Sequence, residues 1–230
     1  AVVGRYKGRI HGWDVVNEAL NEDGTMRQSP WMKIIGEDYV ARAFEYAQEA
    51  DPKAELYYND YGLTQPAKRA GAVRLVRRLQ AAGIPVHGVN EQGHYSLHHP
   101  SLAEVEAALR DLGALGLKVA ISELDMSFYE WSDRRNLYPD GAPQALLEWQ
   151  AQRYGQLFQL FRRYRDVIDR VTFWGLSDRY SWRNDHPVRG RPDYPLLFDR
   201  DGQPKPAFWT VYRLNEPNEP GGPGGAAGRP

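Results

Sequence analysis

Two glutamates, Glu18 and Glu123, each follow a short apolar segment. Glu18 ends the segment GWDVVNE (residues 12–18), directly after Asn17, and Glu123 ends LKVAISE (117–123), with Asp125 two residues later. Either glutamate alone would be read as a helix cap or a surface charge. If both segments are parallel strands, however, the carboxylates share the face on which barrel active sites are built. Facing carboxylates can hydrolyse glycosides, because one protonates the leaving oxygen while the other attacks the anomeric carbon or activates water.

The elements that must position this pair alternate along the chain. Stretches of helical period separate five short apolar segments, a pattern typical of repeated βα units around a parallel sheet. Each segment is almost continuously apolar, as expected of a strand covered on both faces. The predicted strands cover residues 9–17, 55–59, 85–89, 117–122 and 170–174. Because a closed (β/α)8 barrel has eight such units, we expect either a barrel that lacks three units or an open sheet.

Helices are predicted between these segments, and their ends are marked. Pro52 stops the first helix, because the residue before a proline disfavours the helical region. Ser101 and Glu104 have the spacing of a capping box at the start of the third. The predicted helices cover residues 37–50, 66–83, 102–112, 145–165 and 206–214, and residues 1–8 are predicted to be the end of a further helix.

The composition changes after residue 214. Nine of the 16 residues from 215 to 230 are Gly or Pro, so we predict a catalytic domain over 1–214 and a disordered tail or linker over 215–230. Gly222, Gly224 and Ala227 match a loose dinucleotide-binding pattern there, but no strand precedes them and no helix follows. We therefore expect no dinucleotide site.

The charge balance excludes several classes of function. Lys and Arg total 29 against 30 Asp and Glu, a net charge of -1 that favours neither nucleic acid nor a membrane surface as a partner.

No apolar run approaches the ~18 residues of a membrane span, and the first residues do not look like a signal peptide. With no cysteine and no His-Glu-x-x-His motif, we expect neither a metal nor a cofactor.

Five motifs in order give the chain a family resemblance. WDVVNEAL (13–20), LYYNDYGL (56–63), HGVNEQGH (87–94), ISELDM (121–126) and FWGLSDRYSW (173–182) resemble glycoside hydrolase family 10, the endo-β-1,4-xylanases, in register over residues 1–214. The resemblance implies an α/β fold, a (β/α)8 TIM barrel of which this chain holds about five units (strands 4 to 8). It also implies hydrolysis of internal β-1,4 bonds of xylan, with retention of anomeric configuration.

The same resemblance implies roles for particular residues. Glu18 corresponds to the acid/base and Glu123 to the nucleophile, while Asn17 corresponds to a residue that contacts the sugar 2-hydroxyl. His94 is expected to favour the ionised form of Glu123, and Asp125 to orient His94 from behind. The remaining residues expected to bind substrate are Asn59, Tyr61, Gln92, Trp174 and Trp182.

The chain also departs from the family pattern. The polar residues that members draw from their first three strands are absent here, so we expect weaker substrate binding and slower turnover. An open sheet would expose two edges and favour self-association. The chain could instead be a truncated, weakly active or inactive fragment that binds xylooligosaccharides, or a retaining hydrolase of cellulose or mannan. Because xylan is extracellular, the resemblance implies secretion.

Overall fold

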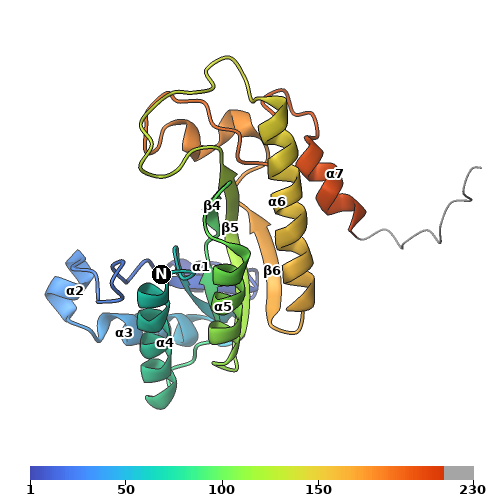
Figure 1. Cartoon of the computed structure of the whole chain (residues 1–230). Helices are drawn as coiled ribbons and strands as arrows, with labels where there is room; N and C mark the ends of the chain where they lie inside the picture. The colour runs from blue at the N-terminus through green and yellow to red at the C-terminus, as the bar shows by residue number, and fades with distance from the viewer. Residues whose placement is uncertain (215–230) are drawn as a thin grey trace, which may run out of the picture.

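Five parallel strand positions form one twisted sheet in the computed structural model, which describes residues 1–214 (Figure 1). Each neighbouring pair is parallel, and helices run alongside the strands that they connect. In sheet order the strands are β1 (Gly12–Asn17), β2 (Glu55–Asp60), β3 (Gly88–Glu91), β5 (Lys118–Ser127) and β6 (Ile168–Phe173), and β4 (His94–Ser96) pairs with the later part of β5. The predicted α/β architecture with five βα units is confirmed.

Strands β3 and β4 form one strand position with an interruption at Gln92 and Gly93. Glu91 pairs with Ile121 and His94 with Asp125, so β5 has one extra residue across the gap. Gly93 has a φ of 84°, and a Cβ there would lie 2.7 Å from Cγ2 of Ile121. Only glycine fits this conformation without a clash. The irregularity lies where Gln92 and Glu123 enter the site, a common use of bulges.

The predicted strand over residues 85–89 began and ended too early. Pro85 cannot donate a ladder hydrogen bond, and pairing starts only at Gly88. Asn90 and Glu91 continue the strand although both are polar, because each has a partner inside the protein. Asn90 Nδ2 donates to Asp14 Oδ1 at 2.6 Å, and Glu91 Oε2 accepts from the backbone of Leu63 at 2.6 Å.

The helices follow the predicted order. A short helix at the start was expected, and the capping box between Ser101 and Glu104 is confirmed. Within residues 1–214, α2 and the two 3-10 turns were not predicted; six residues are too few to show a period, although Ser29 caps α2 and Pro30 begins it. The helices are α1 (Val2–Arg5), α2 (Pro30–Ile35), α3 (Tyr39–Ala50), α4 (Pro66–Ala81), α5 (Leu102–Gly113), α6 (Gln144–Arg163) and α7 (Pro206–Arg213), with short 3-10 turns η1 (Asp178–Tyr180) and η2 (Trp182–Asn184).

Burial divides the sheet into a centre and two edges. The side chains of β2, β3 and β5 are almost all buried, whereas most of those in β1 and β6 are half-buried or exposed. Within residues 1–214, β1 and β6 each pair on one side only. None of the helices in this range is both long and apolar enough to cross a membrane. The predicted tail (215–230) lies outside the described residues.

Candidate active site

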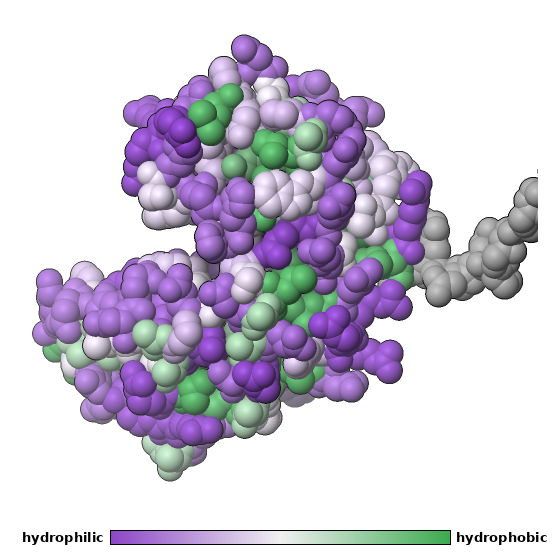
Figure 2. All heavy atoms as spheres, viewed as in Figure 1, coloured by the Kyte–Doolittle hydropathy of each residue, from purple (hydrophilic) through white to green (hydrophobic). Residues whose placement is uncertain are grey.

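A cleft of about 850 Å³ lies at the carboxyl ends of the strands. Figure 2 shows the molecule hollowed on one side, between the loops that follow β5 and β6 and the part that contains α2 and α3. Seven of the ten residues predicted for the site line the cleft, and the other three, Asn17, Asn59 and Asp125, contact members of these seven. The seven are Glu18, Tyr61, Gln92, His94, Glu123, Trp174 and Trp182.

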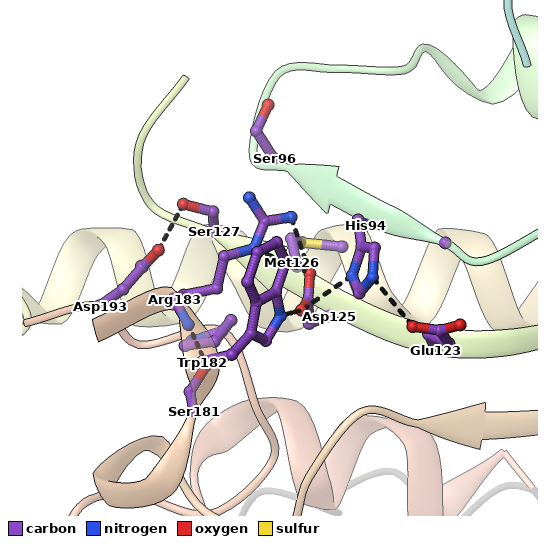
Figure 3. A network of polar contacts seen from close by, with 12 residues as sticks. His94, Ser96, Glu123, Asp125, Met126, Ser127, Ser181, Trp182, Arg183 and Asp193 are labelled. Atoms are coloured by element: carbon purple, nitrogen blue, oxygen red, sulfur yellow. Dashed lines mark hydrogen bonds and ion pairs between the residues drawn. The ribbon is translucent and has the colours of Figure 1, made fainter. Parts of the chain in front are cut away.

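Glu123 lies at the irregular point of β5 and is held from two sides. Nδ2 of Asn59, at the end of β2, donates to its Oε1 at 2.8 Å. Nε2 of His94, at the start of β4, lies 3.2 Å from its Oε2 (Figure 3). Glu123 is 9% exposed, so its carboxylate exchanges most of its hydration for these two protein donors. Its position and orientation are therefore fixed before any substrate binds.

Behind His94, the carboxylate of Asp125 is buried among donors (Figure 3). Its Oδ2 lies 3.0 Å from Nδ1 of His94 and accepts a hydrogen bond from Nε1 of Trp182 at 2.8 Å. Nη2 of Arg183 donates to Oδ1 at 2.9 Å. Burial opposes the charge of Asp125, but Arg183 and His94 outweigh it, so its pKa lies below its usual value. The expected placement of Asp125 behind His94 matches this geometry.

His94 lies between two carboxylates, Asp125 and Glu123. Burial alone would lower its pKa, but the contacts with Asp125 and Glu123 outweigh burial and raise the pKa to about 9. The imidazole is therefore protonated at neutral pH, with Nε2 directed at Glu123 and Nδ1 in an ion-pair contact with Asp125. A cation therefore lies beside the carboxylate of Glu123.

Glu18 follows the last residue of β1 and has a φ of 56°, the only positive φ among the described non-glycine residues. Its backbone N–H donates to the carbonyl of Asn59 at 2.9 Å. Oε1 accepts from Nε2 of Gln92 at 3.1 Å, and Oε2 accepts from Nη1 of Arg27 at 3.2 Å. Such a conformation costs about 1–3 kcal/mol and persists at functional sites when surrounding contacts impose it.

Three amides connect the two glutamates. Oδ1 of Asn17 accepts from Nδ2 of Asn59 at 2.9 Å and from Nε2 of Gln92 at 3.0 Å. Asn59 also donates to Glu123, and Gln92 also donates to Glu18. Side chains from four strand positions thus form one continuous network. This network holds both carboxylates in a fixed relation across the cleft.

Aromatic side chains line the cleft on both sides of the carboxylates. The backbone N–H of Trp174 donates to the carbonyl of Leu124 at 3.0 Å, while the side chain of Trp174 is half exposed. The ring of Trp182 lies 4.9 Å from that of His94. On the Glu18 side, the hydroxyl of Tyr61 accepts from Arg27 at 3.1 Å. Flat apolar faces beside precisely placed polar groups are typical of a ligand site.

Four residues of this arrangement were missed from the sequence. Arg183 directly follows Trp182, and a buried carboxylate such as Asp125 requires a charged partner, but no signal identified which arginine it was. Ser122 donates to Oδ1 of Asn59 at 2.6 Å. Trp131 joins Trp182 and His186 in an aromatic group at the rim. Nothing in the spacing pointed to Arg27. Over residues 1–214, no group of three or more His, Cys, Asp or Glu side chains is arranged to hold a metal.

Comparisons with known proteins agree with this architecture. The family model described as "Glycosyl hydrolase family 10" matches residues 1–214. An endo-1,4-beta-xylanase of Geobacillus stearothermophilus is 48% identical over 93% of this chain and 65% of its own length. Endo-1,4-beta-xylanase B of Paenibacillus barcinonensis is 45% identical over 91% of this chain and 64% of its own length.

Solved structures give the same result. Xylanase XynB from Paenibacillus barcinonensis, crystallised with a conduramine derivative, superposes with a TM-score of 0.88 at 44% identity, over 91% of this chain and 64% of that one. The Thermobacillus composti GH10 xylanase superposes with a TM-score of 0.83 at 50% identity, over 92% and 65%. This chain thus spans a little under two thirds of these relatives. It belongs to glycosyl hydrolase family 10, a family of (β/α)8 barrels, and supplies five of the strand positions.

Proposed function

We propose that this chain carries the catalytic cleft of a retaining endo-1,4-β-xylanase, which hydrolyses internal β-1,4 bonds of xylan and xylooligosaccharides. The observation that supports this most is the amide network that joins Glu18 to Glu123 through Gln92, Asn17 and Asn59. The relatives named as endo-1,4-beta-xylanases support the choice of substrate.

In the first step, Glu123 attacks the anomeric carbon while Glu18 gives its proton to the glycosidic oxygen. The bond to the leaving sugar breaks, and a covalent glycosyl ester forms on Glu123. In the second step, Glu18 takes a proton from water as the water oxygen attacks the same carbon, and the ester bond breaks. Two inversions restore the original configuration, and both glutamates regain their starting protonation states.

The neighbouring residues assist each step. The protonated His94 and the amide of Asn59 hold Glu123 as an oriented carboxylate, and Asp125 keeps His94 charged. Asn17 and Gln92 lie between the glutamates, where the sugar that reacts would present its hydroxyls. Trp174 and Trp182 offer flat faces to sugar rings, and Tyr61 lies on the leaving-group side. The proposed site requires neither metal nor cofactor, because its carboxylates supply the acid, the base and the nucleophile.

Two alternative functions are supported by specific observations. The chain covers 65% of its Geobacillus relative, and an incomplete set of sugar contacts would leave a weakly active or inactive binding fragment. The exposed edges β1 and β6 would also favour self-association.

The carboxylate pair alone would equally suit another β-1,4-glycan such as cellulose or mannan. Because xylan is a polymer outside cells, the enzyme would act after secretion.

The decisive experiment is release of reducing sugar from xylan by the purified 230-residue chain. We expect release that disappears in Glu123→Ala and persists in Arg78→Gln, a matched surface change. Parallel assays on cellulose and mannan identify the polysaccharide. Activity that survives in Glu123→Ala would remove this residue as nucleophile. If no chain releases sugar, calorimetric binding of xylooligosaccharides would support the fragment alternative, and sedimentation at several concentrations would detect self-association.

A further inference from the structure

The Tyr61 loop, residues 61–65, connects β2 to α4 and forms part of the cleft wall. Four of its five residues line the cleft, namely Tyr61, Gly62, Thr64 and Gln65. The fifth residue, Leu63, is fully buried. Leu63 is therefore the point at which this part of the wall is attached to the protein interior.

The backbone of Leu63 is bonded through both its carbonyl and its N–H. The carbonyl accepts from Nη1 of Arg69 at 3.3 Å, and the carbonyl of Thr64 accepts from the same atom at 2.7 Å. Because Arg69 belongs to α4, these bonds attach the loop to the helix that follows it. The N–H of Leu63 donates to Oε2 of Glu91 at 2.6 Å. Since Glu91 ends β3, its carboxylate attaches the loop to the sheet.

The same carboxylate also reaches the interruption between β3 and β4. Oε1 of Glu91 accepts from the N–H of Gly93 at 3.3 Å. Gly93 lies between Gln92 and His94, whose side chains contact the two glutamates of the cleft. One buried side chain therefore connects the Tyr61 loop to the segment that holds the carboxylate pair.

A carboxylate is costly at this place. Glu91 is 2% exposed, and its two donors are backbone amides rather than cations. Burial raises the pKa of Glu91 to about 7 and the carboxylate of Asp60 adds to the rise, while the two amides and His94 oppose it. A well-packed apolar side chain would avoid the cost of burying a charge. What Glu91 contributes instead is a pair of acceptors for two buried N–H groups, which would be costly to leave unpaired.

We propose that Glu91 is a positioning residue, which holds the Tyr61 loop in a fixed place relative to Gln92 and His94 and so helps the cleft to bind the leaving-group part of the substrate. This inference rests on the proposed function, because it takes the Tyr61 side as the place of the leaving sugar. A loop that is held before the substrate arrives loses less freedom when the sugar binds. The contribution of Glu91 should therefore appear with substrates that place a sugar on that side.

Amide hydrogen exchange, followed by NMR on the full 230-residue chain, tests this anchoring without any need for activity. Glu91→Met removes both acceptors and leaves no buried charge. We expect exchange to become about tenfold faster at Leu63, the effect of one lost hydrogen bond. Exchange should also become faster at Tyr61 and Gln65, whose N–H groups bond within the loop and its flanking residue rather than to Glu91. Amides of α6 should keep their rates.

Two further variants complete the exchange experiment. Glu91→Gln has nearly the same shape and keeps one acceptor oxygen, so it should give a smaller rise than Glu91→Met. Glu37→Gln makes the same substitution at an exposed glutamate, and it is the matched control that should leave all these rates unchanged. A rise confined to Leu63 and Gly93 would overturn the proposal, because Glu91 would then be only a local acceptor. An absence of any rise would overturn it as well.

Kinetics on two substrates then separate positioning from a simple loss of stability. Xylotetraose places a sugar on the leaving-group side, whereas β-xylobiosyl fluoride has a single atom there. We expect Glu91→Met to raise KM for xylotetraose about fivefold and to change KM for the fluoride by less than about twofold. A loss of folded protein would lower kcat equally on both, and equal effects on both substrates would contradict positioning. If the unsubstituted chain hydrolyses neither, the proposed function has failed, and the exchange pattern alone decides whether Glu91 holds the loop.

Discussion

Glu123 and Glu18 face one cleft but are held in opposite ways. Glu123 lies in the buried central strand β5, and its partners Asn59 and His94 come from neighbouring strand positions. Glu18 follows the edge strand β1, has a left-handed backbone and depends on Arg27 from a folded-back loop. The central strands therefore fix the proposed nucleophile. The proposed acid, by contrast, remains more open to solvent and to substitutions outside the sheet.

The largest difference between Glu18 and Glu123 should appear when each is replaced by alanine. The loss of hydrolysis should depend on the leaving group of the substrate for Glu18 but not for Glu123. Glu18→Ala should slow hydrolysis of xylan by about 10²–10⁴-fold, because the departing sugar needs a proton. Aryl glycosides with acidic leaving groups should lose far less in the first step. Glu123→Ala should abolish hydrolysis of both substrates, because no ester can form. Steady-state kinetics on both classes measure this, and equal losses for Glu18→Ala would contradict an acid role.

The rigidity of the central strands can be tested at Gly93. Gly93→Ala combines a φ of 84° with a Cβ that lies 2.7 Å from Ile121, and it should lower the free energy of unfolding by about 2–4 kcal/mol. Gly190→Ala is the matched control, because its φ is 70° but nothing lies within 4 Å. It should cost about 1 kcal/mol. Unfolding in urea measures the free energy of unfolding of both variants. Equal losses in Gly93→Ala and Gly190→Ala would show that the clash with Ile121 is relieved.

The last effect concerns pH and the charge on His94. Its pKa is raised from 6.5 to about 9 in the folded protein, so folding favours the protonated form. The resulting stabilisation is complete below about pH 6.5 and is lost as the pH rises through about 9. The difference in unfolding free energy between the unsubstituted chain and His94→Gln should shrink over this range. A difference that stays constant from pH 6 to 10 would contradict a charged imidazole.

Much of this arrangement could be predicted from sequence. The alternation of apolar segments with helical periods predicted five βα units, and the capping box at Ser101 fixed a helix start. Strand ends were less predictable at Asn90 and Glu91. Their polar side chains suggested a loop, yet each finds a partner in the folded chain, the side chain of Asp14 for one and the backbone of Leu63 for the other. Local patterns do not reveal such distant partners.

The sequence by itself determined which residue types stand at the strand ends, because strand period and motif order are local properties of the chain. The tertiary structure decided which of them meet. Only the parallel register brings Asn59 and Gln92 to Asn17. Only the packing of Gly24 against Gly71 fixes the turn that returns Arg27 to Glu18. These contacts join residues from different strands and helices, and their distances depend on how the elements pack rather than on their spacing along the chain.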